Sequence, residues 1–289
     1  MLKLSSLRLS ALLLRILAVA LFVGLFACDD SEETGETISL NCAGEVDTGS
    51  TTTISISGYA KDGKTGSKLS GAVNLYNSTG TTLLDNSSVS SSSKYSFSNL
   101  TPSTYALKSV ISNYTSVADT QCLTSSSTSK DLIALTTSQA TNANVIVLTW
   151  GTTVKDLDAH LQASDGSPST AHIKYNAKGS SSDWAILDLD DTSYSGPETI
   201  TINLDSSSGP MRNSVSKACY YVRIYTNNYS FSQTGAQVQI FQSNGTVLTN
   251  FDVPTDTTYT TKPYWHVFDL DSNLNITTKN TVSSSVPSC

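Results

Sequence analysis

The chain has 289 residues, of which 17 are Lys or Arg and 24 are Asp or Glu, so its formal net charge is −7. This acidic balance argues against nucleic-acid binding, which needs clustered Lys and Arg to neutralise phosphates. It also offers no polybasic patch for anionic lipid head groups. Serine and threonine make up 87 residues and tyrosine 13. Because Thr and Tyr favour strands and Ser favours turns, the composition predicts an almost entirely β fold.

The first 27 residues have the pattern of a targeting segment. Basic Lys3, Arg8 and Arg15 lie on the early side of an apolar run that ends in small residues, which is the arrangement of a secretory signal. We therefore expect residues 1–27 to be removed on export, which leaves 14 basic and 24 acidic residues and a net charge of −10. No later apolar run reaches the ~18 residues that a membrane-spanning helix needs.

The four residues LFAC, which end at Cys28, resemble the bacterial lipobox, although Phe26 is bulkier than the usual residue at its position. The resemblance implies that Cys28 becomes the N-terminus and carries a lipid such as palmitate. Such an anchor would place the chain in the bacterial cell envelope, at the outer membrane, the cell surface or a periplasmic face. A plain signal peptide or an uncleaved anchor is the alternative. Residues 28–50, with their acidic start, would then form a tether.

Residues 51–137 show the pattern of a first β-sandwich. Ile54 and Ile56 alternate with serine, as do Tyr95 and Phe97, and this period of two is typical of strands with one buried face. The sequences GAVNLY, YALKSV and DLIAL predict further strands, and turn sequences such as DGKTG and TPS separate them.

The pieces ISGYAKDGKTGSKLSGAVNLY, YSFSNLTPSTYALK and SNYTS, in this order, resemble the carboxypeptidase regulatory-like domain, a seven-stranded sandwich related to transthyretin. The resemblance covers about 85 residues. It implies a fold and no activity, because such modules are additions to surface and secreted proteins and none of the matched residues is catalytic. Another small sandwich with similar turns is the alternative.

A Ser/Thr-rich linker, 138–141, leads to a second β domain at 142–278 and a C-terminal tail at 279–289. Turn sequences such as DGSP and YSGP separate its short apolar runs. Seven or eight short strands favour a sandwich or jelly roll. The expected fold class is therefore all-β, with two β-sandwich domains in tandem. The expected strands of the second domain are VIVLTW, HIKY, WAILDLDD, ETITINL, YYVRIY, AQVQIF and YWHVFDLD.

The series VLTWGTTVKDLDAHL, LDLDDTSYSGPETITI and YWHVFDLD resembles the YfaP-type bacterial domain, a family of exported proteins whose name records no activity. The resemblance covers most of the second domain, and the combination of DLDxHL, LDxDD and GPETI is its most specific part. It implies a fold and a recurrent acidic motif.

Two acidic motifs in the second domain predict a cation site. Alternate side chains of a strand share one face at a spacing of ~6.5–7 Å, so Asp156 and Asp158 can reach one ion, and LDLDD repeats the pattern. Carboxylate ligands outside the cell favour Ca²⁺, which takes six to eight oxygens, although the spacing is not that of an EF-hand. The alternative is solvated edge strands and Asx turns. The candidate ligands are Asp156, Asp158, Asp188, Asp190, Asp191 and Glu198.

The three histidines of the chain, His160, His172 and His266, all lie in this domain. Three histidines with a carboxylate can form a catalytic zinc site, so a metal-dependent hydrolase is the alternative function. No HExxH or GxSxG motif supports it. His160 shares a face with Asp158, which is expected to orient it, and His266 has the alternation of a hydrogen-bonded core residue.

Four cysteines remain once Cys28 is assigned to the lipid, and they allow three pairings. Export favours disulfides. A pair between Cys42 and Cys122 would bracket the first domain, and a pair between Cys219 and Cys289 would tie the tail to the second. The sequence has no CxxC motif that would suggest structural zinc.

A Tyr- and Asn-rich stretch suits carbohydrate or protein recognition, with strand packing as the alternative. Taken together, these patterns predict a membrane-anchored exported lipoprotein that acts as a non-enzymatic binding or structural module of the cell envelope. Its protein or glycan ligand is not identified by the sequence, and a hydrolase of envelope or extracellular material is the less favoured function. The Tyr- and Asn-rich stretch that suits recognition contains Tyr220, Tyr221, Tyr225, Asn227, Asn228 and Tyr229.

Overall fold

The structure of the chain is a computed structural model. All described residues belong to one contact unit that runs from Ile38 to Cys289. The predicted signal peptide, Cys28, Cys42 and the predicted linker lie outside the described residues. Within the described part, no helix combines the length and the apolar character that crossing a membrane requires. The structure describes residues 38–40, 46–48, 53–115, 118–123, 127–136, 143–164, 172–204, 211, 215–226, 228–241, 247–255 and 258–289.

Almost every regular element in these ranges is a β-strand, which confirms the all-β prediction. The helical element among the described residues is a single 3₁₀ turn, η2 (Phe231–Gln233). The predicted tether contains an antiparallel strand pair, β1 (Ile38–Leu40) and β2 (Val46–Thr48).

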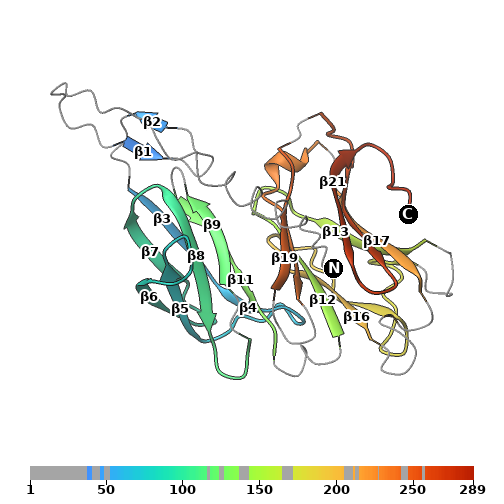
Figure 1. Cartoon of the computed structure of the whole chain (residues 1–289), viewed down its shortest axis with the longest axis horizontal. Helices are drawn as coiled ribbons and strands as arrows, with labels where there is room; N and C mark the ends of the chain where they lie inside the picture. The colour runs from blue at the N-terminus through green and yellow to red at the C-terminus, as the bar shows by residue number, and fades with distance from the viewer. Residues whose placement is uncertain are drawn as a thin grey trace, which may run out of the picture. The chain divides into compact units, whose positions relative to one another are not determined.

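The first sandwich packs a three-stranded sheet against a four-stranded sheet (Figure 1). Its strands are β3 (Ile54–Gly58), β4 (Ala60–Asp62), β5 (Gly71–Tyr76), β6 (Leu83–Val89), β7 (Tyr95–Leu100), β8 (Ser103–Val110), β9 (Ala118–Leu123), β10 (Ser127–Ser129) and β11 (Leu132–Ala134). The strand orders are β10-β3-β7 and β6-β5-β8-β9, and β4 pairs separately with β11. The β10–β3 and β11–β4 pairs are parallel and the others are antiparallel.

The predicted alternation in β3 and β7 is confirmed, and it forms the core of the first sandwich. Ile54, Ile56, Tyr95 and Phe97 are each no more than 1% exposed. They pack against apolar residues of the four-stranded sheet, such as Leu107. Burial of apolar side chains is the main stabilising contribution to such a fold, so this sandwich has its own core.

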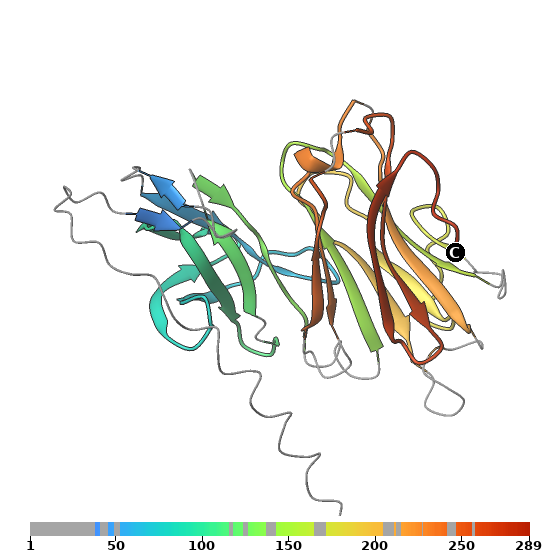
Figure 2. The ribbon, with the colours of Figure 1, turned by 45° about the horizontal axis from the view of Figure 1, so that its top comes forward.

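The second sandwich packs two five-stranded sheets face to face, and all its strand pairs are antiparallel (Figure 2). One sheet contains β12 (Ala143–Thr149), β15 (Ala185–Leu189), β16 (Glu198–Asn203), β18 (Gln237–Phe241) and β19 (Val247–Asp252). The other contains β13 (Leu157–Ala163), β14 (His172–Ile173), β17 (Lys217–Ile224), β20 (Tyr264–Asp271) and β21 (Ile276–Ser283). Their orders are β15-β16-β12-β18-β19 and β14-β13-β17-β20-β21.

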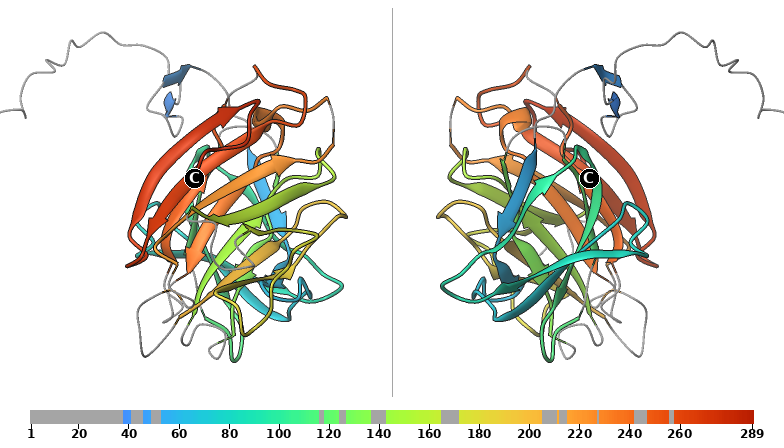
Figure 3. Two further views of the ribbon diagram at one scale, coloured as in Figure 1. Left: turned by 90° about the vertical axis from the view of Figure 1, so that its right-hand side faces the viewer. Right: turned by 90° about the vertical axis from the view of Figure 1, so that its left-hand side faces the viewer.

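The space between these sheets is filled by apolar side chains at alternate positions. Ile200 and Ile202 of β16 are at most 1% exposed, as predicted, and Leu157, Ala159 and Leu161 of β13 face them across the core. The even-numbered residues of β13 therefore lie on the outer face of the second sheet, which the left panel of Figure 3 shows from outside.

The second sandwich differs from the prediction at its C-terminal end. Strand β21 continues past Thr278 to Ser283, into the expected tail. Beyond it, Cys289 forms a disulfide with Cys219 of β17, the pair expected from their positions. The C-terminus lies over the outer face of the sheet that contains β17 (Figure 3). The edge strand β21 was not apparent from the sequence because its side chains are mostly exposed and lack apolar alternation.

Candidate metal centre

Asp158 lies on the outer face of β13 but is only 4% exposed. Its neighbour Asp156 precedes the strand and is partly buried. The interpretation of DLDAH as a solvated acidic edge is therefore wrong for Asp158. Carboxylates at these positions need partners inside the protein, because an uncompensated buried charge is costly.

Glu198 meets these aspartates from the opposite sheet. It begins β16 and shares the inward face of Ile200 and Ile202, so its side chain enters the space between the sheets and is 1% exposed. Its Oε2 accepts a 2.6 Å hydrogen bond from the backbone N–H of Ala159. This bond fixes the carboxylate beside β13.

One oxygen of each of three carboxylates is buried without a hydrogen-bond partner. These atoms are Oδ1 of Asp156, Oδ2 of Asp158 and Oε1 of Glu198. Ligand oxygens of the same three residues lie within 4.8 Å of one another. Two of the predicted ligand motifs, DLD and GPE, thus converge in space.

The pKa values of the three carboxyls show how unfavourable this arrangement is for negative charge. Burial, followed by the charge of Asp156, raises the pKa of Asp158 to about 7. Burial also raises the pKa of Glu198 well above its usual value, and Asp158 and Asp190 add to the effect against the hydrogen bond from Ala159. The pKa of Asp156 is raised by burial and by Asp190. A cation among the three would reverse these effects.

Asp190 and Asp191 lie at the margin of the cluster. Asp190 forms a 2.9 Å ion pair with Lys178 and acts electrostatically on all three carboxyls. Asp191 accepts hydrogen bonds from the backbone and hydroxyl of Ser193 at 2.7 and 2.6 Å, which is an Asx-type turn. Asp190 is therefore the nearer candidate for a fourth ligand.

The structure does not bring Asp188 to this site. Asp188 forms a 2.9 Å ion pair with Lys64 of the first sandwich and accepts a hydrogen bond from the Thr201 hydroxyl. Its neighbour Leu187 is in the core, so alternation turns Asp188 to the outer face of its sheet, on the side opposite Glu198.

His160 follows Asp158 on the same face of β13, but its partner is another histidine. Its Nδ1 lies 2.9 Å from Nε2 of His172, which is 3.1 Å from the Tyr221 hydroxyl. Burial lowers the pKa of His160 to about 3 and that of His172 to about 4, so both rings are neutral at neutral pH. In the described part of the chain, His160 bonds to His172 and not to the Asp158 carboxylate that was expected to orient it.

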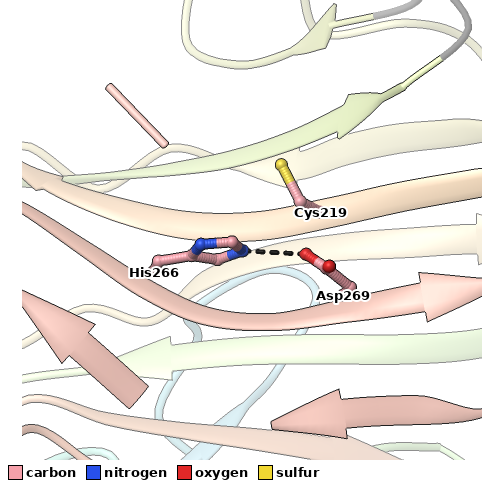
Figure 4. Close-up of side chains that lie close together, drawn as sticks. All are labelled: Cys219, His266 and Asp269. Carbon is pink, nitrogen blue, oxygen red and sulfur yellow. Dashed lines mark hydrogen bonds and ion pairs between the residues drawn. The ribbon is translucent and has the colours of Figure 1, made fainter. Parts of the chain in front are cut away.

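A second group of potential ligands, Cys219, His266 and Asp269, lies on β17 and β20 (Figure 4). The sulfur of Cys219 is in the disulfide with Cys289, so it is not available as a thiolate. His266 contacts Asp269 at 2.9 Å and is not in the core. The expected core position of His266 is not observed, because the register of the β20–β21 pair shifts between His266 and Phe268 and breaks the alternation.

Asp269 also pairs with Lys217 at 3.4 Å and Lys279 at 3.2 Å. Burial opposes its ionisation, but hydrogen bonds from Lys279 and His266 outweigh burial and hold its pKa below the usual value. With its charge already compensated by these partners, we interpret this group as an ion-pair network.

The remaining candidate residues from the sequence differ in how deeply they are buried. Cys122 is disulfide-bonded, but Cys42 lies outside the described residues, so their pairing stays a prediction. Tyr220 and Tyr221 are buried, and Tyr229 packs partly against the core, while Tyr225 is 47% exposed with Lys262 over its ring. Asn227 lies outside the described residues, and Asn228 has a positive φ of 71°.

Sequence reasoning missed Arg223 and the role of Tyr221. Arg223 lies opposite Asp158 in the β13–β17 register and has a buried Nε without a hydrogen-bond partner. Tyr221 lies opposite His160 in the same register. The register of two strands separated by about 60 residues cannot be read from either strand alone.

No protein-family model matches the chain, and no curated protein matches it. Among solved structures, the major pilin subunit BcpA of Bacillus cereus is 7% identical, with 70% of this chain and 67% of the pilin covered and a TM-score of 0.28. A candidate carbohydrate-binding protein from Bacteroides uniformis is 14% identical, with 70% and 96% covered and a TM-score of 0.25. The major pilin SpaD of Corynebacterium diphtheriae is 10% identical, with 74% and 66% covered and a TM-score of 0.27. These likenesses are too weak to support a conclusion about function.

Proposed function

We propose that this chain is an exported, lipid-anchored protein of the bacterial cell envelope that acts as a non-enzymatic binding or structural module. We further propose that Ca²⁺ held by Asp156, Asp158 and Glu198 stabilises its second sandwich. The anchoring part rests on the sequence pattern that ends at Cys28. The calcium part rests on the geometry of the three carboxylates.

The observation that carries the calcium proposal is the set of three buried carboxylate oxygens without hydrogen-bond partners, on residues whose ligand oxygens lie within 4.8 Å of one another. Leaving one buried polar group unsatisfied costs about 1–3 kcal/mol, and more when it is charged. Three such groups in one place also repel one another. A bound cation removes both costs together.

The ligand chemistry favours Ca²⁺. All three groups offer oxygen, and Ca²⁺ binds oxygen at about 2.3–2.6 Å, so two ligands on opposite sides of the ion are separated by about 4.6–5.2 Å. A spread of up to 4.8 Å suits this ion. Asp190, backbone carbonyls and water would complete the six to eight ligands that it takes.

The position of the site favours a structural role. An ion there would join the β13 strand to Glu198 at the start of β16, which lies in the opposite sheet. Asp158 and Glu198 are 4% and 1% exposed, which leaves little room for a substrate beside the ion. The ion would therefore act as a link between the two sheets.

Calorimetric titration of the metal-free full-length chain with Ca²⁺ and Zn²⁺ tests the proposal. We expect one Ca²⁺ per chain, lost in Glu198→Gln, which removes the charge and keeps the shape. Asp271→Asn is the matched control, because Asp271 is an exposed residue at the end of β20 whose carboxylate accepts hydrogen bonds from Asn275. Absence of Ca²⁺ binding, or equal binding in Glu198→Gln, would refute the calcium site. Tight Zn²⁺ binding in its place would favour the hydrolase.

The anchoring part has a separate test. The parent chain is expected in the membrane fraction of cells with a fatty-acyl mass on Cys28. Cys28→Ser is expected to lose both. A soluble parent chain without acyl mass would contradict the lipid anchor and leave the calcium site unaffected.

A further inference from the structure

We propose that His160 and His172 form a second metal site, for a late first-row divalent ion that prefers imidazole, with Cu²⁺ as its type. The two rings come from β13 and β14, on the outer face of the sheet. This site shares no ligand with the carboxylate cluster, and the chemistry of its ligands is different.

The distance between the two ring nitrogens suits coordination of one ion. Nδ1 of His160 and Nε2 of His172 are 2.9 Å apart. Imidazole nitrogens bind such ions at about 2.0–2.1 Å, so two of them at right angles around the ion lie about 2.9 Å apart. Right-angled nitrogen ligands belong to the tetragonal geometry of Cu²⁺ and Ni²⁺. A small rotation of each ring would direct both lone pairs at a shared ion.

Hydrogen bonding alone does not satisfy this group. Nε2 of His172 is approached by Nδ1 of His160 at 2.9 Å and by the Tyr221 hydroxyl at 3.1 Å. A neutral imidazole nitrogen carries either one proton or one lone pair, so it cannot serve both neighbours fully.

Neighbouring side chains hold the two rings close to the binding geometry before any ion binds. His160 stacks on Tyr221 with ring centroids 4.7 Å apart and an interplanar angle of 10°. His172 lies opposite Gln162 in the β13–β14 register, and the Tyr221 hydroxyl contacts it from the third strand. Tyr221 is therefore a positioning residue for both rings. His172 is only partly buried, which gives an ion access.

The local charge selects the type of ion. Lys174 and Arg223 act electrostatically on His160 as positive neighbours and oppose any cation there, so an ion at this site must gain its binding energy from the imidazole nitrogens. Affinity for imidazole rises along the first-row series to Cu²⁺, so ions at this end bind where Ca²⁺ does not. The two sites are therefore expected to bind different ions.

Titration of the full-length chain, purified without a histidine tag, with Cu²⁺ tests the proposal by calorimetry and electron paramagnetic resonance. The expected result is one Cu²⁺ whose spectrum shows two coordinated nitrogens. His160→Gln or His172→Gln is expected to lower the affinity at least about 100-fold, since removal of a ligand costs more than the 10- to 100-fold loss of an orienting partner. Tyr221→Phe is expected to lower it about 10-fold and keep the two-nitrogen spectrum.

His266→Gln is the matched control, because His266 contacts Asp269. It is expected to leave Cu²⁺ binding unchanged, and Glu198→Gln should do the same. Melting curves of each variant without metal verify folding. The proposal is overturned if Cu²⁺ does not bind with two-nitrogen coordination, or if folded His160→Gln and His172→Gln variants bind it as the parent does.

Discussion

The two sandwiches share a fold class but differ in how they satisfy buried polar groups. In the first sandwich, Asp62 is 5% exposed and accepts hydrogen bonds from two backbone N–H groups and from the Tyr114 hydroxyl. Asp131 accepts a hydrogen bond from the backbone N–H of Tyr59 and forms an ion pair with Lys61 at 2.8 Å. These carboxylates are compensated by the sandwich's own atoms.

The second sandwich is different. Among the described residues, every buried side-chain nitrogen or oxygen atom without a hydrogen-bond partner belongs to this sandwich. Buried polar groups in folded proteins are nearly always paired, so a concentration of exceptions in one sandwich marks a site. The residues that carry these atoms are Asp156, Asp158, His160, Glu198, Tyr220 and Arg223.

The comparison can be measured because the chain's three tryptophans, Trp150, Trp184 and Trp265, all lie in the second sandwich. Tryptophan fluorescence therefore reports its unfolding. Both sandwiches contain tyrosine, so a transition seen in the tyrosine signal without a matching change in the tryptophan signal reports the first sandwich. The following experiments use this separation of signals.

The largest expected effect comes from the disulfide between Cys219 and Cys289, which closes a separation of 70 residues. Replacing both with serine is expected to lower the unfolding free energy of the second sandwich by about 4 kcal/mol, from the chain-entropy cost of a loop of this length. Denaturant titration followed by tryptophan fluorescence measures it. If the whole tyrosine signal moved with the tryptophan signal and no unshifted transition remained, the two sandwiches would unfold together, which would break the comparison.

Ca²⁺ is expected to have the next largest effect, again on the second sandwich. At a free concentration of 100 times its dissociation constant, a ligand that binds only the folded state stabilises it by about 2.7 kcal/mol. Thermal melting followed by tryptophan fluorescence, with Ca²⁺ or with EDTA, measures the shift. Stabilisation of the first sandwich alone would place the ion elsewhere.

Asp62→Ala tests the compensated carboxylates of the first sandwich. It removes the acceptor of two backbone N–H groups and is expected to destabilise this sandwich by about 2 kcal/mol. The tyrosine-monitored transition that has no tryptophan counterpart should move, and the tryptophan-monitored transition should not. Asp85→Ala is the control, because Asp85 is exposed on β6 and its loss should cost less than about 0.5 kcal/mol.

The smallest expected effect is that of pH on the metal-free chain. The folded pKa of Asp158 is about 7 against 3.8 in the unfolded chain, so the folded state holds the proton more tightly. Its contribution to stability is complete below pH 3.8 and is lost as the pH rises through about 7. The raised pKa of Glu198 acts in the same direction.

We therefore expect the metal-free second sandwich to lose about 1 kcal/mol between mildly acidic and mildly alkaline pH, after allowance for solvent screening. Ca²⁺ needs the ionised carboxylates, so the stabilisation that it gives should increase over the same range. Asp158→Asn should flatten the pH dependence. A metal-free chain that becomes more stable as the pH rises would contradict the described electrostatics.

Much of the fold could be predicted because period-two alternation is a local signal. Ile54, Ile56, Ile200 and Ile202 were identified as core residues in this way, and all four are buried. Strand β21 was not predicted because an exposed edge strand does not need the apolar alternation on which the method depends.

The candidate site could be predicted only in part. The motifs identified Asp156, Asp158 and Glu198. Packing, however, decides which face of each strand is turned towards the other sheet. The same alternation that buries Leu187 places Asp188 on the outer face of the sheet, where it forms an ion pair with Lys64. The pairing of His160 with His172 and Tyr221 depends on the registers of three strands, which no short stretch of sequence specifies.

A crystal structure of the chain grown with Ca²⁺ tests the central claim most directly. The account predicts anomalous density for one ion bounded by carboxylate oxygens of Asp156, Asp158 and Glu198, at about 2.3–2.6 Å from each. An ordered water, or direct hydrogen bonds between protonated carboxyls in saturating Ca²⁺ at neutral pH, would contradict it.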